Sequence, residues 1–267
     1  MNSYKIEGTT LVVYDRWGVR DYCRDSDIHI TEFNLHVIIN EAVTDCSGMF
    51  YGCETFNQPI VIPNGVEDCS QMFERCRAFN QSVKIPCSVR ICNFMFARCE
   101  SLNQPINLPE EWECLIEAQE NVKRLYNNAT VCVANTRNEV SCSGMFCDCK
   151  SFNQYVTIPR GVKGCAQMFQ YCTAFNQTVV IPDTVECCRD MFEGCKILNQ
   201  PIILSENIRD CTHMFCRCYE FNQRVTIPNG AVKYMDAFEE CPGYFNDVTR
   251  VYTPSVSDIK AKTNLFY

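Results

Sequence analysis

Residues 46–63 read CSGMFYGCETFNQPIVIP, and this stretch decides the fold because it recurs along the chain. The pattern begins again at Cys69, Cys92, Cys142, Cys165, Cys188 and Cys211. Neighbouring copies start 23 residues apart, except that Cys142 follows Cys92 after 50 residues, which is twice 23 plus four. A fixed period of about 20–50 residues is the sequence signature of a repeat architecture.

Less regular copies of the pattern, here called worn coils, extend the repeat at both ends. Asn34 stands 23 residues before Asn57, and Tyr234 stands 23 residues after Cys211. We therefore predict about ten coils, with caps where the terminal coils would otherwise face water. The predicted organisation is an N-terminal cap at 1–21, a single repeat domain at 22–254 with a degenerate coil and insertion at 115–141, and a C-terminal cap at 255–267.

Each coil contains two kinds of pattern. The alternation of Ile60-Val61-Ile62 predicts a short strand whose middle side chain points outward, and a proline ends it. Val66, Cys69, Met72 and Phe73 follow at mixed spacings that predict a tight helical or 3₁₀ turn with one buried face. The expected fold is a leucine-rich-repeat-like solenoid, with short parallel β-strands on one face and tight turns on the other. In the N-terminal cap, residues 9–14 (TTLVVY) predict a further strand.

The recurring frame MF-x-x-C-x-x-F-N-Q-x-x-x-I-P-x-x-V-x-x-C resembles the BspA-like leucine-rich repeats and the related Mycoplasma-lipoprotein-type repeat, over roughly residues 33–245. The resemblance implies a curved or twisted right-handed solenoid that binds other molecules, and it implies no catalytic residues. Such repeats occur in bacteria, phages, large viruses and protists. A phage- or bacterium-encoded inhibitor of a host protein is therefore one form that the function could take, and a cell-surface adhesin is the alternative.

The chain contains 22 cysteines in 267 residues, and most of them fall into two columns of equivalent repeat positions. Cysteines beside Phe and Met positions are expected to be small buried hydrophobic residues with free thiols. Disulfides between coils are the alternative, but the absence of a secretory signal sequence favours a reducing compartment, the cytoplasm of the producing or infected cell. The first column is Cys46, Cys69, Cys92, Cys142, Cys165, Cys188 and Cys211; the second is Cys53, Cys76, Cys99, Cys149, Cys172, Cys195, Cys218 and Cys241.

Zinc is the alternative use for these thiols. Cys142, Cys147 and Cys149 form one cluster, and Cys211, His213, Cys216 and Cys218 form another. Column members point inward while Cys147 and Cys216 share a different, outward column, so four ligands do not converge. We therefore expect no metal and no cofactor. Cys147, Cys187 and Cys216 fall outside the columns and are the thiols to test for reactivity, which the sequence leaves open.

Two further columns are expected to be structural. A column of asparagines is expected to hydrogen-bond peptide groups left unpaired at the bends, in the same coil or the next. It comprises Asn34, Asn57, Asn80, Asn103, Asn153, Asn176, Asn199 and Asn222. A parallel column of Phe56, Phe79, Phe152, Phe175 and Phe221, with Leu102 and Leu198, is expected to form the core.

Composition excludes several functions. The net charge of −8 argues against binding nucleic acid or anionic lipid, since both require a basic face. No run of about 18 apolar residues predicts a membrane span. The three histidines, His29, His36 and His213, stand in no nucleophile–base pattern, and no phosphate loop, HExxH or GxSxG occurs. We expect no enzymatic activity.

The expected function is binding of another protein through the outward strand face. Outward strand positions in water should be polar, yet Val61, Val180 and Ile203 are apolar, and they predict a stripe that marks an interface. The same stripe could join copies of this chain. The irregular segment is a second candidate for contact. The predicted partner-binding residues are Val61, Lys84, Asn107, Tyr155, Thr157, Val180, Ile203, Arg224 and Thr226 on the strand face, with Arg124 and Arg137 in the irregular segment.

Overall fold

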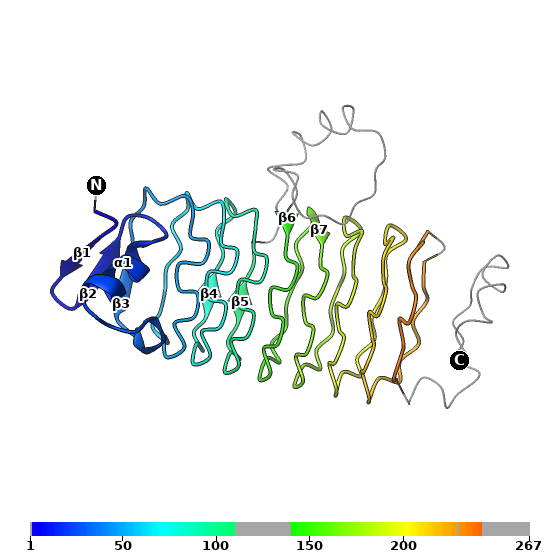
Figure 1. Ribbon diagram of the computed structural model, residues 1–267. Coiled ribbons are helices and arrows are strands. Elements are labelled where there is room, and N and C mark those ends of the chain that lie inside the picture. Colours follow the sequence, from blue (N-terminus) through cyan, green and yellow to red (C-terminus); the bar gives the residue numbers. More distant parts are fainter. Residues whose placement is uncertain (1, 110–139, 229, 242–267) are drawn as a thin grey trace, which may run out of the picture.

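The computed structural model describes residues 2–109, 140–228 and 230–241. Figure 1 shows the chain winding into a row of similar coils that lie side by side, with a small sheet and a helix at the N-terminal end. Equivalent residues of neighbouring coils face one another along the row, because successive coils start 23 residues apart.

The N-terminal elements cover one end of the row. β1 (Tyr4–Glu7) pairs antiparallel with β2 (Thr10–Val13), and β2 pairs parallel with β3 (His36–Ile39), so the sheet order is β1-β2-β3. α1 (Gly18–Asp25) and the 3₁₀ helix η1 (Ile30–Glu32) connect β2 to β3. Since β3 occupies the strand position of the first coil, β2 continues the strand side and shields the end of the stack from water.

α1 crosses the boundary that the sequence places between cap and first coil at residue 21. It packs tightly on the sheet at Gly18, where an added Cβ would lie 2.6 Å from the carbonyl oxygen of Ser3 and 2.8 Å from the Val13 side chain. Cys23, which the sequence assigns to the first coil, sits on this helix and is buried. Among the described residues, no helix is both long and apolar enough to cross a bilayer.

The strand side of the later coils shows the predicted alternation but little strand pairing. The outer residues of segments 60–62, 156–158 and 225–227 are buried and the middle residue is exposed. Within the described coils these segments are not hydrogen-bonded strands, contrary to the prediction; pairing is limited to β4 (Val83–Lys84) with β5 (Ile106–Asn107) and to one bridge between Val180 and Ile203. Pro63, Pro159 and Pro228 directly follow these three segments and have no N–H to extend a ladder.

A second line of parallel contacts, which the sequence does not predict, runs just before the first cysteine column. β6 (Val140–Ser141) pairs with β7 (Val162–Gly164), and single bridges extend the line in both directions. In three of these coils an aspartate accepts a hydrogen bond from the N–H two residues later and so starts the turn. The residues in this line are Asp45, Asp68, Ile91, Ser141, Gly164, Cys187, Asp210 and Lys233.

The turn that follows is neither an α-helix nor a 3₁₀ helix, which corrects the prediction. Within it, Met49, Tyr51 and Cys53 each donate their N–H to the carbonyl three residues back. The intervening residues Gly48 and Gly52 have left-handed backbone angles, with φ of 62° and 76°. A left-handed residue breaks the helical succession of peptide groups.

Left-handed residues turn alternate peptide groups toward the neighbouring coil. The N–H groups of Gly48, Phe50 and Gly52 donate to carbonyls 22 residues later, at 2.8–2.9 Å. Equivalent bonds recur in the other described repeats, including those where Gln71 and Arg75 adopt the left-handed conformation in place of glycine. A non-glycine residue in this conformation costs about 1–2 kcal/mol, which the bonds between coils offset.

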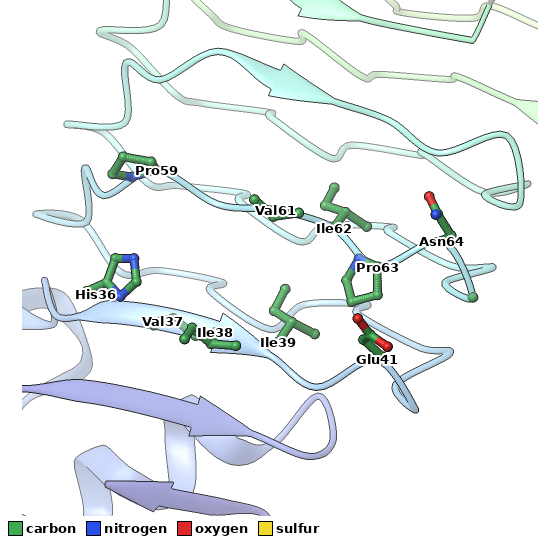
Figure 2. A pocket seen from close by; sticks show the side chains of 11 residues that line it. His36, Val37, Ile38, Ile39, Glu41, Pro59, Val61, Ile62, Pro63 and Asn64 are labelled. Atoms are coloured by element: carbon green, nitrogen blue, oxygen red, sulfur yellow. The ribbon is translucent and has the colours of Figure 1, made fainter. Parts of the chain in front are cut away.

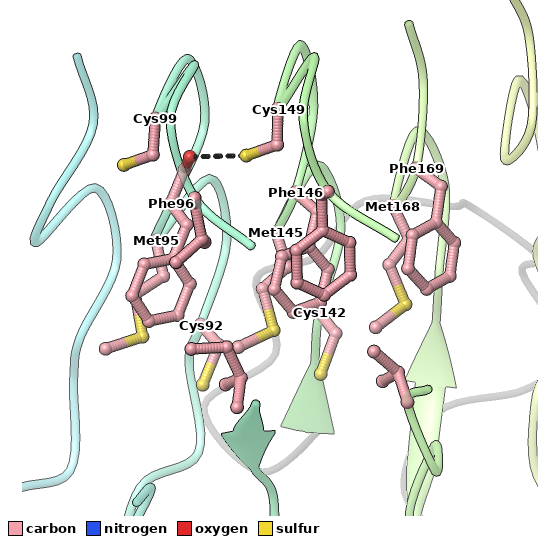
Figure 3. Close-up of a cluster of buried hydrophobic side chains, with 14 of the residues drawn as sticks. Cys92, Met95, Phe96, Cys99, Cys142, Met145, Phe146, Cys149, Met168 and Phe169 are labelled. Carbon is pink, nitrogen blue, oxygen red and sulfur yellow. Dashed lines mark hydrogen bonds between the residues drawn. The ribbon is translucent and has the colours of Figure 1, made fainter. Parts of the chain in front are cut away.

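Stacked aromatic rings fill the interior (Figure 3). Phe50, Phe73 and Phe96 are fully buried, and their rings stack nearly parallel at centroid distances of 5.3–5.4 Å. The predicted column that includes Phe56 and Phe79 stacks beside this one. Ring centroids of the two columns are 4.4–4.5 Å apart within a coil. Two phenylalanine columns and one methionine column therefore run along the core of the described coils.

Both cysteine columns are buried, and every described cysteine is a free thiol. The thiols of the second column pack in the core and also donate hydrogen bonds to backbone carbonyls of the preceding coil. Cys149 Sγ lies 3.0 Å from the carbonyl oxygen of Phe96 (Figure 3), and Cys172 Sγ lies 2.9 Å from that of Phe146. In the first column, the neighbouring thiol of Cys142 and burial together raise the pKa of Cys92 well above its ordinary value.

The asparagine column connects each coil to the next through its side-chain oxygens. Asn153 Oδ1 accepts from the backbone N–H of Asn176 at 2.8 Å, and Asn176 Oδ1 accepts from that of Asn199 at 2.9 Å. In most coils the glutamine of the next coil also donates to this oxygen. Gln200, which follows Asn199, donates its side-chain amide to Asn176 Oδ1 at 3.3 Å. These side chains are half-buried or exposed rather than buried.

The stack passes directly from the coil of Cys92 to that of Cys142. The Cys92 N–H donates to the Ser141 carbonyl at 3.1 Å, and the rings of Phe96 and Phe146 stack at 5.9 Å. Residues 110–139, which hold most of the predicted degenerate coil at 115–141, lie outside the described residues, as does the predicted C-terminal cap at 255–267. Within the described residues these two coils are direct neighbours, although the sequence predicts a degenerate coil between them. At the repeat positions this segment has Ala118-Gln119 in place of Met-Phe and Val122 in place of Cys.

Removing one stacked ring should destabilise the chain strongly. Phe169 is fully buried between the rings of Phe146 and Phe192. We expect Phe169→Ala to lower the free energy of unfolding by about 3–5 kcal/mol, because it removes apolar contacts and leaves a cavity. Tyr155→Ala, at a side chain 57% exposed, should change it by about 0.5 kcal/mol or less. Urea unfolding measures both, and equal effects of the two substitutions would contradict the stacked core.

Buried thiols should make the fold sensitive to alkali. Burial raises the pKa of Cys46 and Cys211 to about 12 each, whereas an unfolded thiol has a pKa of about 8.5. Their contribution to stability is fully present below about pH 8.5 and is lost as pH rises toward 12. Each such thiol should lower the free energy of unfolding by about 1.4 kcal/mol per pH unit in that window.

Unfolding in reductant at pH 7–11 tests this, with the double variant Cys46→Ala and Cys211→Ala as the comparison. The variant should show a pH slope that is shallower by about 3 kcal/mol per unit above pH 9. An identical slope in parent and variant would show that these thiols ionise equally in both states.

Candidate protein-interaction surface

The strand face consists of the outward residue of each strand-side segment and the residue two positions before it. Every described residue of the predicted partner-binding set on this face is exposed. Val61 and Ile203 are the most exposed apolar side chains of the set, at 84% and 81%, and Val180 follows at 60%. The set is Val61, Lys84, Asn107, Tyr155, Thr157, Val180, Ile203, Arg224 and Thr226.

The apolar residues at the outward strand positions fall into two patches rather than the single stripe expected, and the exposed Tyr155 lies between them. Lys84, Asn107 and Thr157 occupy the outward positions of the middle coils, and β4 pairs Lys84 directly with Asn107. An N-terminal apolar patch (Ile38, Pro59 and Val61) and a C-terminal apolar patch (Val180, Pro201 and Ile203) lie on either side. In the C-terminal apolar patch, Val180 and Ile203 are bridged neighbours on adjacent coils, so their side chains lie next to each other.

The N-terminal apolar patch borders a hollow of about 640 Å³ between the first two coils. Figure 2 shows Ile38 and Val61 in its middle, with His36 and Pro59 at one end and Glu41 and Asn64 at the other. The hollow therefore offers an apolar centre with a charged or polar group at each end.

Sequence reasoning missed Ile38 as a member of the strand face, although its position signals it. Ile38 stands 23 residues before Val61, is 49% exposed and lies on β3. Extending the outward column into the worn first coil identifies it. The other predicted contact residues, Arg124 and Arg137, lie outside the described residues.

Exposure of the remaining thiols differs from the sequence prediction. Cys187 and Cys216 are buried and Cys147 is half-buried, whereas Cys87 is exposed. Burial is the main cause that raises the pKa of Cys147 to about 11 and that of Cys216 to about 12. Of the described cysteines, Cys87 is therefore the most accessible to a modifying reagent in the folded chain.

The thiols of the two cysteine clusters weighed for zinc lie in two different environments. Cys149 donates its thiol to the Phe96 carbonyl, and Cys218 donates its thiol to the Phe192 carbonyl at 3.0 Å, both inside the core. Cys147 and Cys216 lie at the rim, where their thiols face Gln170 and Glu239 respectively. The column and rim thiols thus point to different partners.

Coils of one period, with the same residue types at equivalent positions, define a repeat protein. The family described as "Mycoplasma protein of unknown function, DUF285" matches residues 26–139, 121–202 and 140–250. The chain belongs to this family. The match supports, in broad terms, the predicted resemblance to BspA-like leucine-rich-repeat proteins.

One solved structure is similar to the chain at low identity. It is a leucine-rich repeat protein from Bacteroides ovatus ATCC 8483, with 19% sequence identity and a TM-score of 0.36. The alignment covers 86% of this chain and 52% of that one, so the chain spans about half the length of this relative. No curated protein matches the chain.

Proposed function

We propose that the chain is a non-enzymatic scaffold, a repeat solenoid whose strand face binds another protein. The observation that supports this most is the C-terminal apolar patch, where two aliphatic side chains on adjacent coils stand 60% and 81% exposed side by side. Contiguous exposed apolar surface is unfavourable in water and is typical of an interaction site.

The stack behind the patch suits it to binding. Val179, Ile181 and Ile202, which flank Val180 and Ile203 in sequence, are buried in the core and fix the backbone. A patch held in this way loses little conformational entropy when a partner docks. A partner with apolar side chains, contacting the two apolar patches and Tyr155 between them, fits this surface.

The narrower features of the proposal rest on the sequence. Repeats of this type occur in phages and bacteria, so an inhibitor of a host protein acting in the cytoplasm is one specific form of the function. The net charge of −8 favours a protein partner over nucleic acid or an anionic membrane. No cofactor is part of the proposal.

Capture experiments test the strand face. The purified chain is immobilised, lysate proteins of a candidate host are passed over it, and bound proteins are identified by mass spectrometry. Adding charge with Val180→Glu plus Ile203→Glu should weaken capture by about 2 kcal/mol or more, because apolar contacts at the centre of an interface dominate its energy.

Ile197→Glu is the matched control, because Ile197 is an aliphatic side chain 45% exposed at a turn position off the strand face. Capture lost in the double variant but retained in the control supports the proposal, whereas capture unchanged in the double variant rejects this face. Light scattering on the same proteins distinguishes self-association: if the parent is a dimer and the double variant a monomer, the partner is a second copy.

A further inference from the structure

Stacking gathers three metal-ligating side chains at the last described coils. Ligand atoms of His213, Asp236 and Glu239 all lie within 4.8 Å of one another. Asp236 is the equivalent of His213 one coil later, and Glu239 is likewise the equivalent of Cys216. The residues are therefore distant in sequence and become neighbours through the repeat register.

A buried carboxylate orients the histidine of this group. Asp190, one coil before His213, has a side chain only 10% exposed, and its Oδ1 lies 3.2 Å from His213 Nδ1. Its other oxygen pairs with Arg189 at 3.4 Å. With Nδ1–H donating to Asp190, the lone pair of Nε2 faces Asp236, whose Oδ2 lies 3.8 Å away. Metal-bound histidines are commonly held by a carboxylate in this way.

The two remaining carboxylates lack a basic partner. Among the described residues, neither Asp236 nor Glu239 forms an ion pair with a lysine or an arginine. The Cys216 thiol faces Glu239 Oε2 at 3.7 Å and supplies no positive charge. Two converging carboxylates with no lysine or arginine paired to them leave a negative site that a divalent cation would neutralise.

We propose that His213 Nε2, Asp236 and Glu239 bind one divalent transition-metal ion of the zinc type, which joins the last two described coils. One imidazole nitrogen with two carboxylate oxygens is a donor set that zinc accepts, whereas calcium and magnesium prefer oxygen ligands alone. The site lies at turn positions, separate from the strand face, and is independent of the proposed function.

Zinc titration of the reduced full chain, in competition with a chromophoric chelator, tests the site. The parent should bind one equivalent that is lost in His213→Gln and in Asp236→Asn. Asp190→Asn, which removes only the orienting carboxylate charge, should weaken this equivalent by about 10–100-fold. Asp183→Asn, at an exposed aspartate paired with Arg160, and Cys87→Ser, at the exposed thiol, should leave it unchanged.

Thermal unfolding gives a second readout that separates binding from misfolding. Zinc should raise the unfolding temperature of the parent and of Asp183→Asn but not that of His213→Gln; if His213→Gln does not fold, Glu239→Gln, at an exposed side chain, replaces it. The proposal is overturned if the parent binds no zinc, which would leave a histidine–carboxylate ion pair only. It is equally overturned if His213→Gln binds as the parent does, or if Cys87→Ser removes the equivalent.

Discussion

Backbone hydrogen bonds between neighbouring coils are the constraint on which the rest of the structure depends. In each turn, alternate N–H groups such as those of Phe50 and Gly52 donate to the next coil, while the groups between them close turns within their own coil. One coil therefore cannot satisfy its own backbone. Neighbouring coils must superimpose in register, so each position in a coil lies against its equivalent, 23 residues away in most coils and 50 away between the coils of Cys92 and Cys142.

This register explains why the same residue types recur. A ring that lies against its equivalent in the next coil stacks on it. The rings of Phe169 and Phe192 have centroids 5.7 Å apart and an interplanar angle of 2°. A cysteine suits the second column because it is small and apolar, yet its thiol can donate to the Phe carbonyl of the coil before, as Cys172 does to Phe146. The high cysteine content is thus a consequence of stacking and requires neither disulfides nor metal in these columns.

Much of this could be predicted from sequence, because period and residue type survive in every clear repeat. The inward and outward columns, with Val61 exposed between buried Ile60 and Ile62, followed from alternation alone. The left-handed turn could not be predicted, since Gln71 and Arg75 adopt positive φ where no glycine signals it. Direct stacking of Phe96 on Phe146, and the approach of Asp236 and Glu239 to His213, depend on which coils become neighbours. The spacing of the repeats in the sequence does not show which coils become neighbours.

Amide hydrogen exchange in an asparagine variant tests the dependence of one coil on another most directly. Asn176 Oδ1 accepts from the Asn199 N–H, while the Asn176 N–H donates to Asn153. In Asn176→Ala, exchange at Asn199 should accelerate by about tenfold or more, while exchange at position 176 stays unchanged; Asn176→Asp, which keeps an acceptor oxygen, should retain most of the protection. Unchanged exchange at Asn199, or acceleration confined to the substituted coil, would contradict the account.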